Sequence, residues 1–276
     1  MPTKSERFAT EPAAEEAATS AGGRLEKIAL PLAAAALLLF VWTAAVKLSH
    51  TNVFPSPWKV VTGMRQLVGR GVLWQYIYDS LRRVLTGYGL ALLVGVPAGL
   101  ALGWSRNLAS AFDPVVQMCR PISPLAWMPL AILWFGVAEA APIFLIFLGA
   151  FFPIVVATMN GVKSVPAIYL QAGRNFGLSA AGVLRRVVLP AALPQVLVGL
   201  RLSLGIAWLV VVAAEMIAVD SGLGYLIIDS RNAGKRYDLV VAGMLLIGLI
   251  GLGLDVLIRR LEKLESVRWG FIGDAA

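Results

Sequence analysis

Long stretches without charged residues constrain the fold of this chain more than any other feature. A helix needs roughly 20 mostly apolar residues to cross the ~30 Å hydrocarbon core of a bilayer. Such stretches cover residues 28–46, 84–105, 121–138, 140–162, 196–217 and 239–254; Arg201 interrupts the fifth, and the sixth can lengthen past Asp255. We therefore predict an all-α polytopic membrane protein with six transmembrane helices.

Composition excludes most catalytic classes. The chain is 58% hydrophobic and only 14% charged, whereas a soluble domain usually carries about a quarter charged residues. Cys119 and His50 are the single residues of their types, which excludes a disulfide framework, an HExxH zinc site and a Ser-His-Asp triad. We expect no catalytic residues, no metal site and no cofactor.

The net charge of +8 does not indicate a nucleic-acid binder, because its lysines and arginines lie between the apolar stretches. Lysines and arginines are more numerous in the segments that lie on the same side of the membrane as the N-terminus than in those on the other side. Because cytoplasmic loops carry the excess of these residues, this predicts that both termini are cytoplasmic. Residues 1–26 are aperiodic and predict a disordered cytoplasmic tail. The stretch 28–46 is too long, and starts too far along the chain, for a typical signal peptide.

A short helix is predicted on the outer side, after the first span. Ser56 is a candidate N-cap and Pro57 a first helical residue. Residues 27–77 would then hold the first transmembrane helix and this second helix, which either lies in the membrane interface or packs on neighbouring helices.

The connection 163–194 is patterned as two short cytoplasmic helices. Pro166 opens the first, and Gly177 suits the left-handed residue that often follows a helix end. Ser179 is a candidate N-cap for the second. We expect Pro190 and Pro194 to end this second helix before the fifth span.

This connection resembles the coupling loop of the permease subunits of ABC importers, whose pattern is E-A-A-x3-G-x9-I-x-L-P. The matching residues are Gln171, Ala172, Gly173, Gly177, Leu189 and Pro190. Gln171 replaces the acidic residue, and Gly173 replaces the second alanine. A charged contact of that acidic residue with the ATPase would be weaker or absent here.

Two further stretches, 124–136 and 214–227, look like those of nitrate, sulphonate and taurine importer permeases. The resemblance covers roughly residues 50 to 268. It implies a type I ABC importer permease fold in a bacterial inner membrane, with the permease domain at 78–259 and a cytoplasmic tail at 260–276. The implied partners are cytoplasmic ABC ATPase subunits, an extracytoplasmic substrate-binding protein and a second permease copy; ATP hydrolysis falls to the partner ATPase.

The candidates for a gate or pathway are polar residues near or within the spans. A carboxylate inside a span is costly, so Glu215 should be paired; it either shapes an outer gate with Ser221, Gly222 and Gly224 or has a structural hydrogen-bonding role. Arg120 and Arg201 would either attract an anionic substrate or contact anionic lipid at the interface.

The predicted function is the import of a small anion, such as an aliphatic sulphonate, taurine or nitrate. The main alternative is a carrier driven by an ion gradient, which would need intramembrane ionisable relays or paired discontinuous helices. An intramembrane enzyme and a scaffold without transport are further alternatives.

Overall fold

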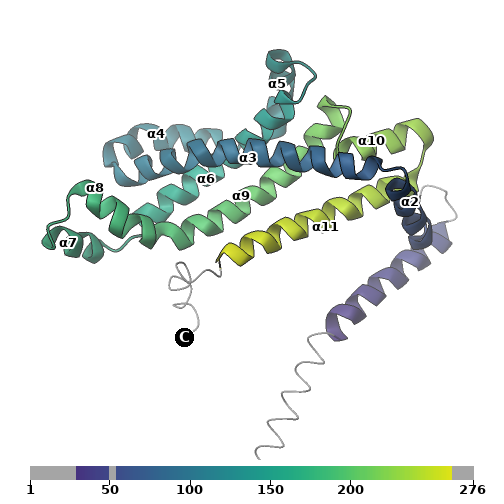
Figure 1. Ribbon diagram of the computed structural model, residues 1–276, viewed down its shortest axis with the longest axis horizontal. Helices are drawn as coiled ribbons and strands as arrows, with labels where there is room; N and C mark the ends of the chain where they lie inside the picture. The colour runs from purple at the N-terminus through teal and green to yellow at the C-terminus, as the bar shows by residue number, and fades with distance from the viewer. Residues whose placement is uncertain (1–28, 50–53, 263–276) are drawn as a thin grey trace, which may run out of the picture. The chain divides into compact units, whose positions relative to one another are not determined.

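The computed structural model describes residues 29–49 and 54–262, and every regular element in these ranges is a helix (Figure 1). The chain divides into two units, residues 1–62 and 63–276. The predicted disordered tail 1–26 and most of the predicted tail 260–276 lie outside the described residues.

The first unit contains an apolar helix, Ala29–Ser49, and the start of α2, Pro57–Gly69. The predicted cap is confirmed, because the Lys59 N–H donates to the Ser56 hydroxyl at 3.4 Å. The two sequence features that predicted α2, a serine followed by proline, therefore set its start.

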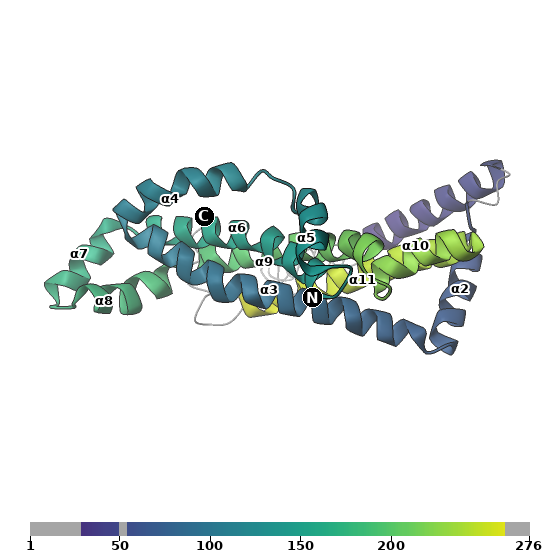
Figure 2. The same ribbon diagram turned by 90° about the horizontal axis from the view of Figure 1, so that it is seen from above.

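The second unit holds the remaining helices. In chain order they are α3 (Val72–Trp104), α4 (Arg106–Cys119), the 3₁₀ turn η1 (Pro124–Trp127), α5 (Met128–Phe135), α6 (Ala140–Lys163), α7 (Ala167–Asn175), α8 (Ala180–Val183), the π-helical turn η2 (Leu184–Val188), α9 (Leu189–Ala218), α10 (Leu223–Gly234) and α11 (Tyr237–Glu262). The turn α7–α8 and the helix α10 lie at opposite ends of this unit (Figures 1 and 2).

Close packing of α3, α6 and α9 forms the core. On α3, glycines at positions 87, 95, 99 and 103 face α6, so that a methyl group at Gly87 would lie 2.8 Å from the Ile143 carbonyl oxygen. Ala91, fully buried, continues the same four-residue spacing. Small residues at this spacing let helix backbones approach closely, which is how helices associate in lipid.

Five helices in the described ranges are long and apolar enough to cross a membrane: Ala29–Ser49, α3, α6, the α8–α9 helix and α11. The predicted span 121–138 corresponds instead to a shorter apolar stretch, Pro124–Phe135. Pro124 and Pro129 start its two turns, and Gly136, with φ 73°, ends it. The six predicted apolar segments are thus five long helices and one short one.

The predicted break at Pro190 and Pro194 is wrong. α8 continues through η2 into α9 without interruption, and both prolines lie within helical structure. Proline normally clashes with the preceding turn of an α-helix. A π-helical turn is wider, and here it ends two residues before Pro190, so the chain can pass the proline and remain helical.

The helix that holds the predicted second span, 84–105, begins earlier, at Val72. The 33 residues of α3 measure about 50 Å at 1.5 Å each. This exceeds the hydrocarbon core, so α3 extends beyond it.

Replacing Gly99 by leucine should destabilise the protein, because a methyl group at Gly99 would already lie 2.7 Å from the Val155 carbonyl oxygen. Overpacking of this kind typically costs about 1–3 kcal/mol. Thermal unfolding in detergent would measure the effect. Gly89→Leu is the control, because nothing lies within 4 Å of the side-chain position of Gly89 on the same helix; equal losses in both variants would contradict the packing explanation.

Candidate functional site

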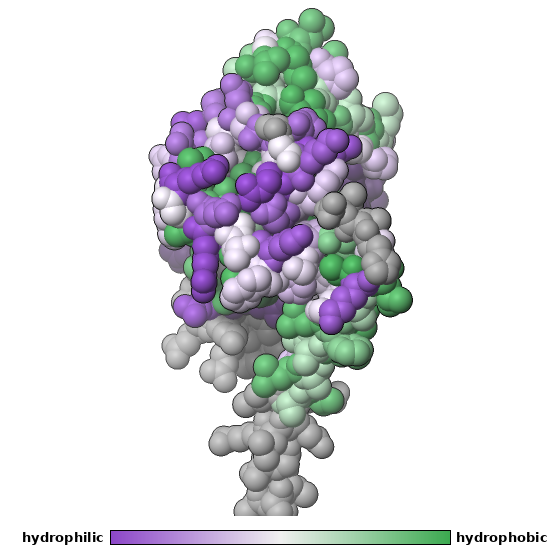
Figure 3. All heavy atoms as spheres, turned by 90° about the vertical axis from the view of Figure 1, so that its right-hand side faces the viewer, coloured by the Kyte–Doolittle hydropathy of each residue, from purple (hydrophilic) through white to green (hydrophobic). Residues whose placement is uncertain are grey.

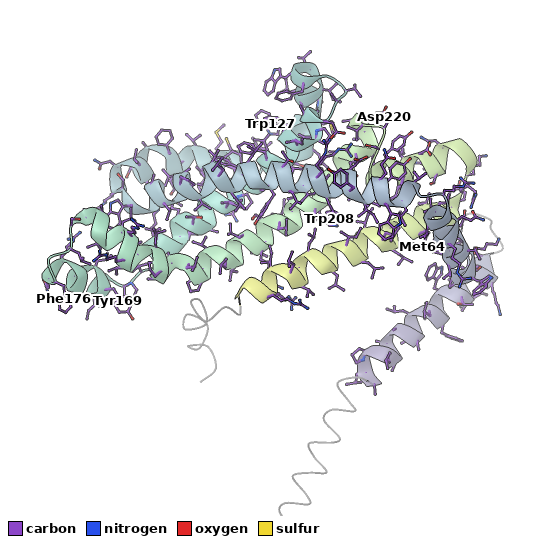
Figure 4. All side chains as sticks on the ribbon, in the orientation of Figure 1. Met64, Trp127, Tyr169, Phe176, Trp208 and Asp220 are labelled. Carbon is purple, nitrogen blue, oxygen red and sulfur yellow. The ribbon has the colours of Figure 1, made fainter. Side chains whose placement is uncertain are left out.

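The predicted site residues fall into two separate groups and two single positions. The residues that match the coupling-loop pattern lie at the α7–α8 end. Glu215, Ser221, Gly222 and Gly224 come together at the α10 end, where Asp220 is marked in Figure 4. Arg120 and Arg201 lie apart from both groups.

The turn between α7 and α8 is tightly determined. Gly177 has φ 77°, its N–H donates to the Arg174 carbonyl, and the Leu178 N–H donates to the Gly173 carbonyl at 3.1 Å. This pair of bonds is the Schellman arrangement, which favours glycine at the left-handed position. The prediction for Gly177 is confirmed.

The second short helix is capped as predicted. The Ser179 hydroxyl accepts a hydrogen bond from the Gly182 N–H at 3.2 Å. α7 packs closely onto it: a methyl group at Gly173 would lie 3.3 Å from Val187 and 3.4 Å from Val183. The glycine that departs from the family pattern therefore lies at a tight contact, and the two helices form one rigid piece.

The exposed surface of this piece carries apolar side chains beside polar and charged ones such as Gln171, Arg174 and Arg186. Phe176 is 87% exposed, and Ile168 and Tyr169 are also exposed. Tyr169 lies in the first turn of α7 and Phe176 directly follows its last residue, and Figure 4 marks both at the α7 end of the unit. Gln171 is exposed on the same helix, while Ala172 is half-buried. An aromatic tip of this kind on a rigid helix pair is suited to insertion into a partner protein.

Leu189 and Pro190 lie at the start of α9 and are both exposed. They do not mark the end of a helix, as the sequence predicted, but the point at which the α8 helix passes into the long α9.

At the other end, Glu215 is completely buried and paired with Arg83. A partner was expected, because Glu215 lies within a predicted span. The Arg83 Nη1 donates to Glu215 Oε1 at 2.7 Å, and both side chains have no exposed surface. The Ser80 hydroxyl donates to Glu215 Oε2 at 2.9 Å. A paired and hydrogen-bonded charge is the form in which a carboxylate can be retained among apolar helices.

The turn after α9 wraps around this carboxylate. The Gly224 N–H donates to Glu215 Oε2 at 3.0 Å, and Arg83 donates to the Ser221 carbonyl and hydroxyl oxygens. Gly222 has φ 106°, and any side chain on it would overlap the Glu215 carboxylate. The predicted association of Glu215 with Ser221, Gly222 and Gly224 is therefore present in the structure.

A second carboxylate completes the cluster from the α5–α6 loop. Glu139 accepts hydrogen bonds from Arg83 Nε at 3.0 Å and from Arg82 Nη2 at 2.7 Å. Bonds from Arg83 and then Arg82 lower the pKa of the Glu139 carboxyl below its ordinary value of 4.5. We refer to Ser80, Arg83, Glu139, Glu215 and Ser221 as the Arg83–Glu215 cluster.

Sequence reasoning missed three members of this cluster: Ser80, Arg83 and Glu139. Ser80 and Arg83 are three residues apart and thus lie on one face of α3. The need to pair Glu215 pointed to a cation at the same depth, and Arg83 directly precedes a predicted span. Taking that arginine as the boundary of the span concealed its role.

Arg201 also contacts an acidic residue of another helix. Its Nε donates to Asp255 Oδ1 of α11 at 2.6 Å, and Asp255 also accepts from Arg259. Arg201 and Asp255 are each about one-third exposed.

Arg120 caps the end of α4 and is exposed. It lines a cavity of ≈ 540 Å³ between the α4–η1 linker, α6 and α9. Within residues 29–49 and 54–262, no group of three or more His, Cys, Asp or Glu side chains is placed to hold a metal ion.

Comparison with known proteins identifies the family. Residues 91–266 match the family model of the binding-protein-dependent transport system inner membrane component. The chain belongs to this family. It is therefore a multi-pass inner-membrane permease of an ABC import system, which agrees with the resemblance seen in the sequence.

Two similar permeases are named for different substrates, taurine and nitrate. The taurine transport system permease protein TauC of Escherichia coli is 36% identical over 246 residues, which are 86% of this chain and 88% of that protein. The nitrate import permease protein NrtB of Synechocystis is 35% identical over 250 residues, 86% and 89% of the two chains.

The fold also matches solved transporters. A bacterial alginate ABC transporter, solved in complex with an alginate-bound periplasmic protein, matches with a TM-score of 0.56 and 16% identity, over 90% of this chain and 97% of that one. At this identity the likeness shows the shared permease fold.

Arg83→Met should strongly destabilise the permease, because it leaves Glu215 buried without its partner. Removing one member of a buried pair typically costs about 3–5 kcal/mol, whereas the double variant Arg83→Met/Glu215→Gln should recover part of the loss. Denaturant titration in detergent would measure both. Arg82→Met is the control, since Arg82 contacts the same Glu139 but is 48% exposed and should cost less than about 1 kcal/mol. Additive losses in the double variant would contradict the pairing.

Glu139 should make stability depend on acid pH. Because its pKa is lower in the folded protein than in the unfolded chain, its contribution is fully present above pH 4.5 and is lost as pH falls from there through the folded pKa. Melting curves in detergent at decreasing pH would show a steeper decline for the wild type than for Glu139→Gln. Parallel declines would exclude the proposed protonation.

Proposed function

We propose that this permease imports a small oxyanion, an aliphatic sulphonate such as taurine, or nitrate, and that α7 and α8 receive the movement of a cytoplasmic ABC ATPase. The observation that carries the coupling role is the rigid helix pair with its exposed aromatic tip at one end of the α3–α6–α9 core. The substrate class rests on the taurine and nitrate permeases, which are similar over most of the chain.

Each predicted coupling residue has a mechanical role in this proposal. Gly177 allows the tight turn, Gly173 and Ala172 let α7 pack onto the next helix, and Gln171 lies on the exposed side towards the ATPase. Leu189 and Pro190 join the pair to α9.

Movement would pass along a continuous helix. When ATP draws the two ATPase subunits together, they push on α7, which moves α8 because the two pack as one piece. Since α8 continues into α9, the push reaches the Arg83–Glu215 cluster, where Glu215 lies near the far end of the same helix. There, Glu215 with Ser221, Gly222 and Gly224 would form the outer gate, and the ATP-bound state would favour the outward-open arrangement.

The opposite end would face the binding protein. Hydrophilic side chains gather on the end at which α10 lies, with apolar ones beside them (Figure 3), as expected of a surface in contact with water and a soluble partner. We propose that the α7–α8 end, and both termini of the chain, lie in the cytoplasm. The permease domain would cover residues 78–259.

A second copy of this chain would complete the transport path. On α5, Leu133 is 77% exposed and Trp134 is 56% exposed, which favours burial against either lipid or another permease. We propose the second copy, because the path of a permease lies between its two membrane subunits.

The alternative of an ion-gradient carrier is not favoured. It would need ionisable groups free to take up ions inside the membrane, whereas Glu215 and Asp255 are each paired with arginine. Transport abolished by an ionophore and indifferent to ATP would favour the carrier.

Gly177→Val should abolish ATPase binding and uptake, while Gly177→Asn should retain both. At φ 77° a β-branched residue is strained, but asparagine tolerates the left-handed region. The measurement is co-purification of the ATPase with tagged permease from native membranes, together with uptake of taurine and nitrate. Wild-type permease without an ATPase in mild detergent, with uptake intact in cells, would contradict the proposed coupling.

A further inference from the structure

We infer that the cavity between the α4–η1 linker, α6 and α9 is a binding site for the transported anion within the permease itself, with Arg120 as its charged residue. The inference rests on the proposed function, since it assumes that a small oxyanion is the substrate. It assigns to the membrane subunit a share in substrate recognition.

The lining of the cavity favours a negative ligand. Among the described residues that line it, Arg120 is the only charged one, and Ser123, Asn160 and Gln195 are the other polar ones; the rest of this wall is apolar or glycine, including Phe152 and Ile206. None of these described lining residues is a carboxylate that would repel an anion. Its volume of ≈ 540 Å³ lies within the usual range of ligand pockets, about 300–1,000 Å³.

The polar groups of this cavity have no partners in the described part of the chain. Arg83 and Arg201 are paired with carboxylates, whereas the side chains of Arg120, Ser123, Asn160 and Gln195 take part in none of the hydrogen bonds or ion pairs between residues 29–49 and 54–262. Their donors are available to a ligand or to water.

Asn160 and Gln195 indicate that this face contacts water rather than lipid. Both are exposed, and they lie on α6 and α9, which are long and apolar enough to span the membrane. An unpaired amide in hydrocarbon is costly, and polar side chains of membrane helices therefore face cavities or partners. The cavity can thus be filled by water and solute.

The chemistry matches a sulphonate or nitrate group. A guanidinium presents several N–H donors in one plane, which suits planar or bidentate contact with oxyanions. The hydroxyl of Ser123 and the amide groups of Asn160 and Gln195 add neutral donors, and Phe152 and Ile206 offer an apolar surface to an alkyl chain.

Cysteine labelling can test the site without measuring transport. In a Cys119→Ser background, Gln195→Cys would be treated with 2-sulphonatoethyl methanethiosulphonate, which itself carries an ethanesulphonate group, and with its cationic trimethylammonium analogue. The importer complex would be held in nanodiscs of phosphatidylcholine. Asn232→Cys, on exposed α10, gives the reference ratio of the two rates.

We expect the anionic reagent to be favoured at Gln195→Cys by on the order of tenfold over the reference at low ionic strength, and by less in high salt. Arg120→Gln should return the ratio to the reference, and Arg120→Lys should retain part of the preference. Arg106→Gln, an exposed arginine of α4 outside this cavity, should have no effect. Added ethanesulphonate should slow the anionic reagent only when Arg120 is present.

Three results would overturn the inference. One is an equal ratio with and without Arg120, and another is no reaction at Gln195→Cys with either reagent. The third is a preference that disappears when phosphatidylglycerol is included, because a lipid headgroup would then occupy the site. Co-purification of the ATPase is measured in parallel. If the ATPase co-purifies while the labelling ratio does not depend on Arg120, only the anion site is contradicted. If no ATPase co-purifies with the unmodified permease, the proposed function itself is contradicted.

Discussion

The buried pair of Arg83 and Glu215 is the interaction on which the α10 end of the structure depends. A lone charge at this position would be expelled from an apolar helix bundle, but here each charge is matched and the remaining lone pairs are filled by Ser80 and the Gly224 N–H. The same arginine also holds Ser221 and Glu139. One side chain of α3 therefore fixes the end of α9, the turn into α10 and the loop before α6.

The rest of the core obeys the complementary constraint that helices in lipid gain little from hydrophobic burial and must gain from close contact. The glycines of α3 provide that contact with α6. α9 is held at one end by polar contacts and along its length by close apolar packing, and together these fix its position. A helix that is to transmit movement needs such a fixed reference, and α3 with α6 supplies it.

Much of this arrangement could be predicted from the sequence, and the reasons for the misses are physical. Helix content, the approximate spans and the turn at Gly177 follow from local rules, such as apolar length and backbone conformation, which act over a few residues. The continuity of α8 and α9 could not be predicted, because it depends on a π-helical turn that local proline rules do not anticipate. Arg83 was hidden for a similar reason: its charge becomes acceptable in a helix only through Glu215 and Glu139, which lie far away in the chain.

The π-helical turn has a consequence for how this family can change by insertion and deletion. Such a turn contains one residue more than the α-helix around it needs. Losing a residue from Leu184–Val188 could therefore leave a regular α-helix, with α9 still in register on α3 and α6. The α7–α8 pair would keep nearly the same direction, because one helical turn would still join it to α9. A residue lost from the α-helical part of α9 would instead rotate the pair by about 100° and shift it by about 1.5 Å relative to the long helices. The π-helical turn is therefore a place where this connection can lose a residue while the exposed surface of α7 keeps its orientation on the helix core.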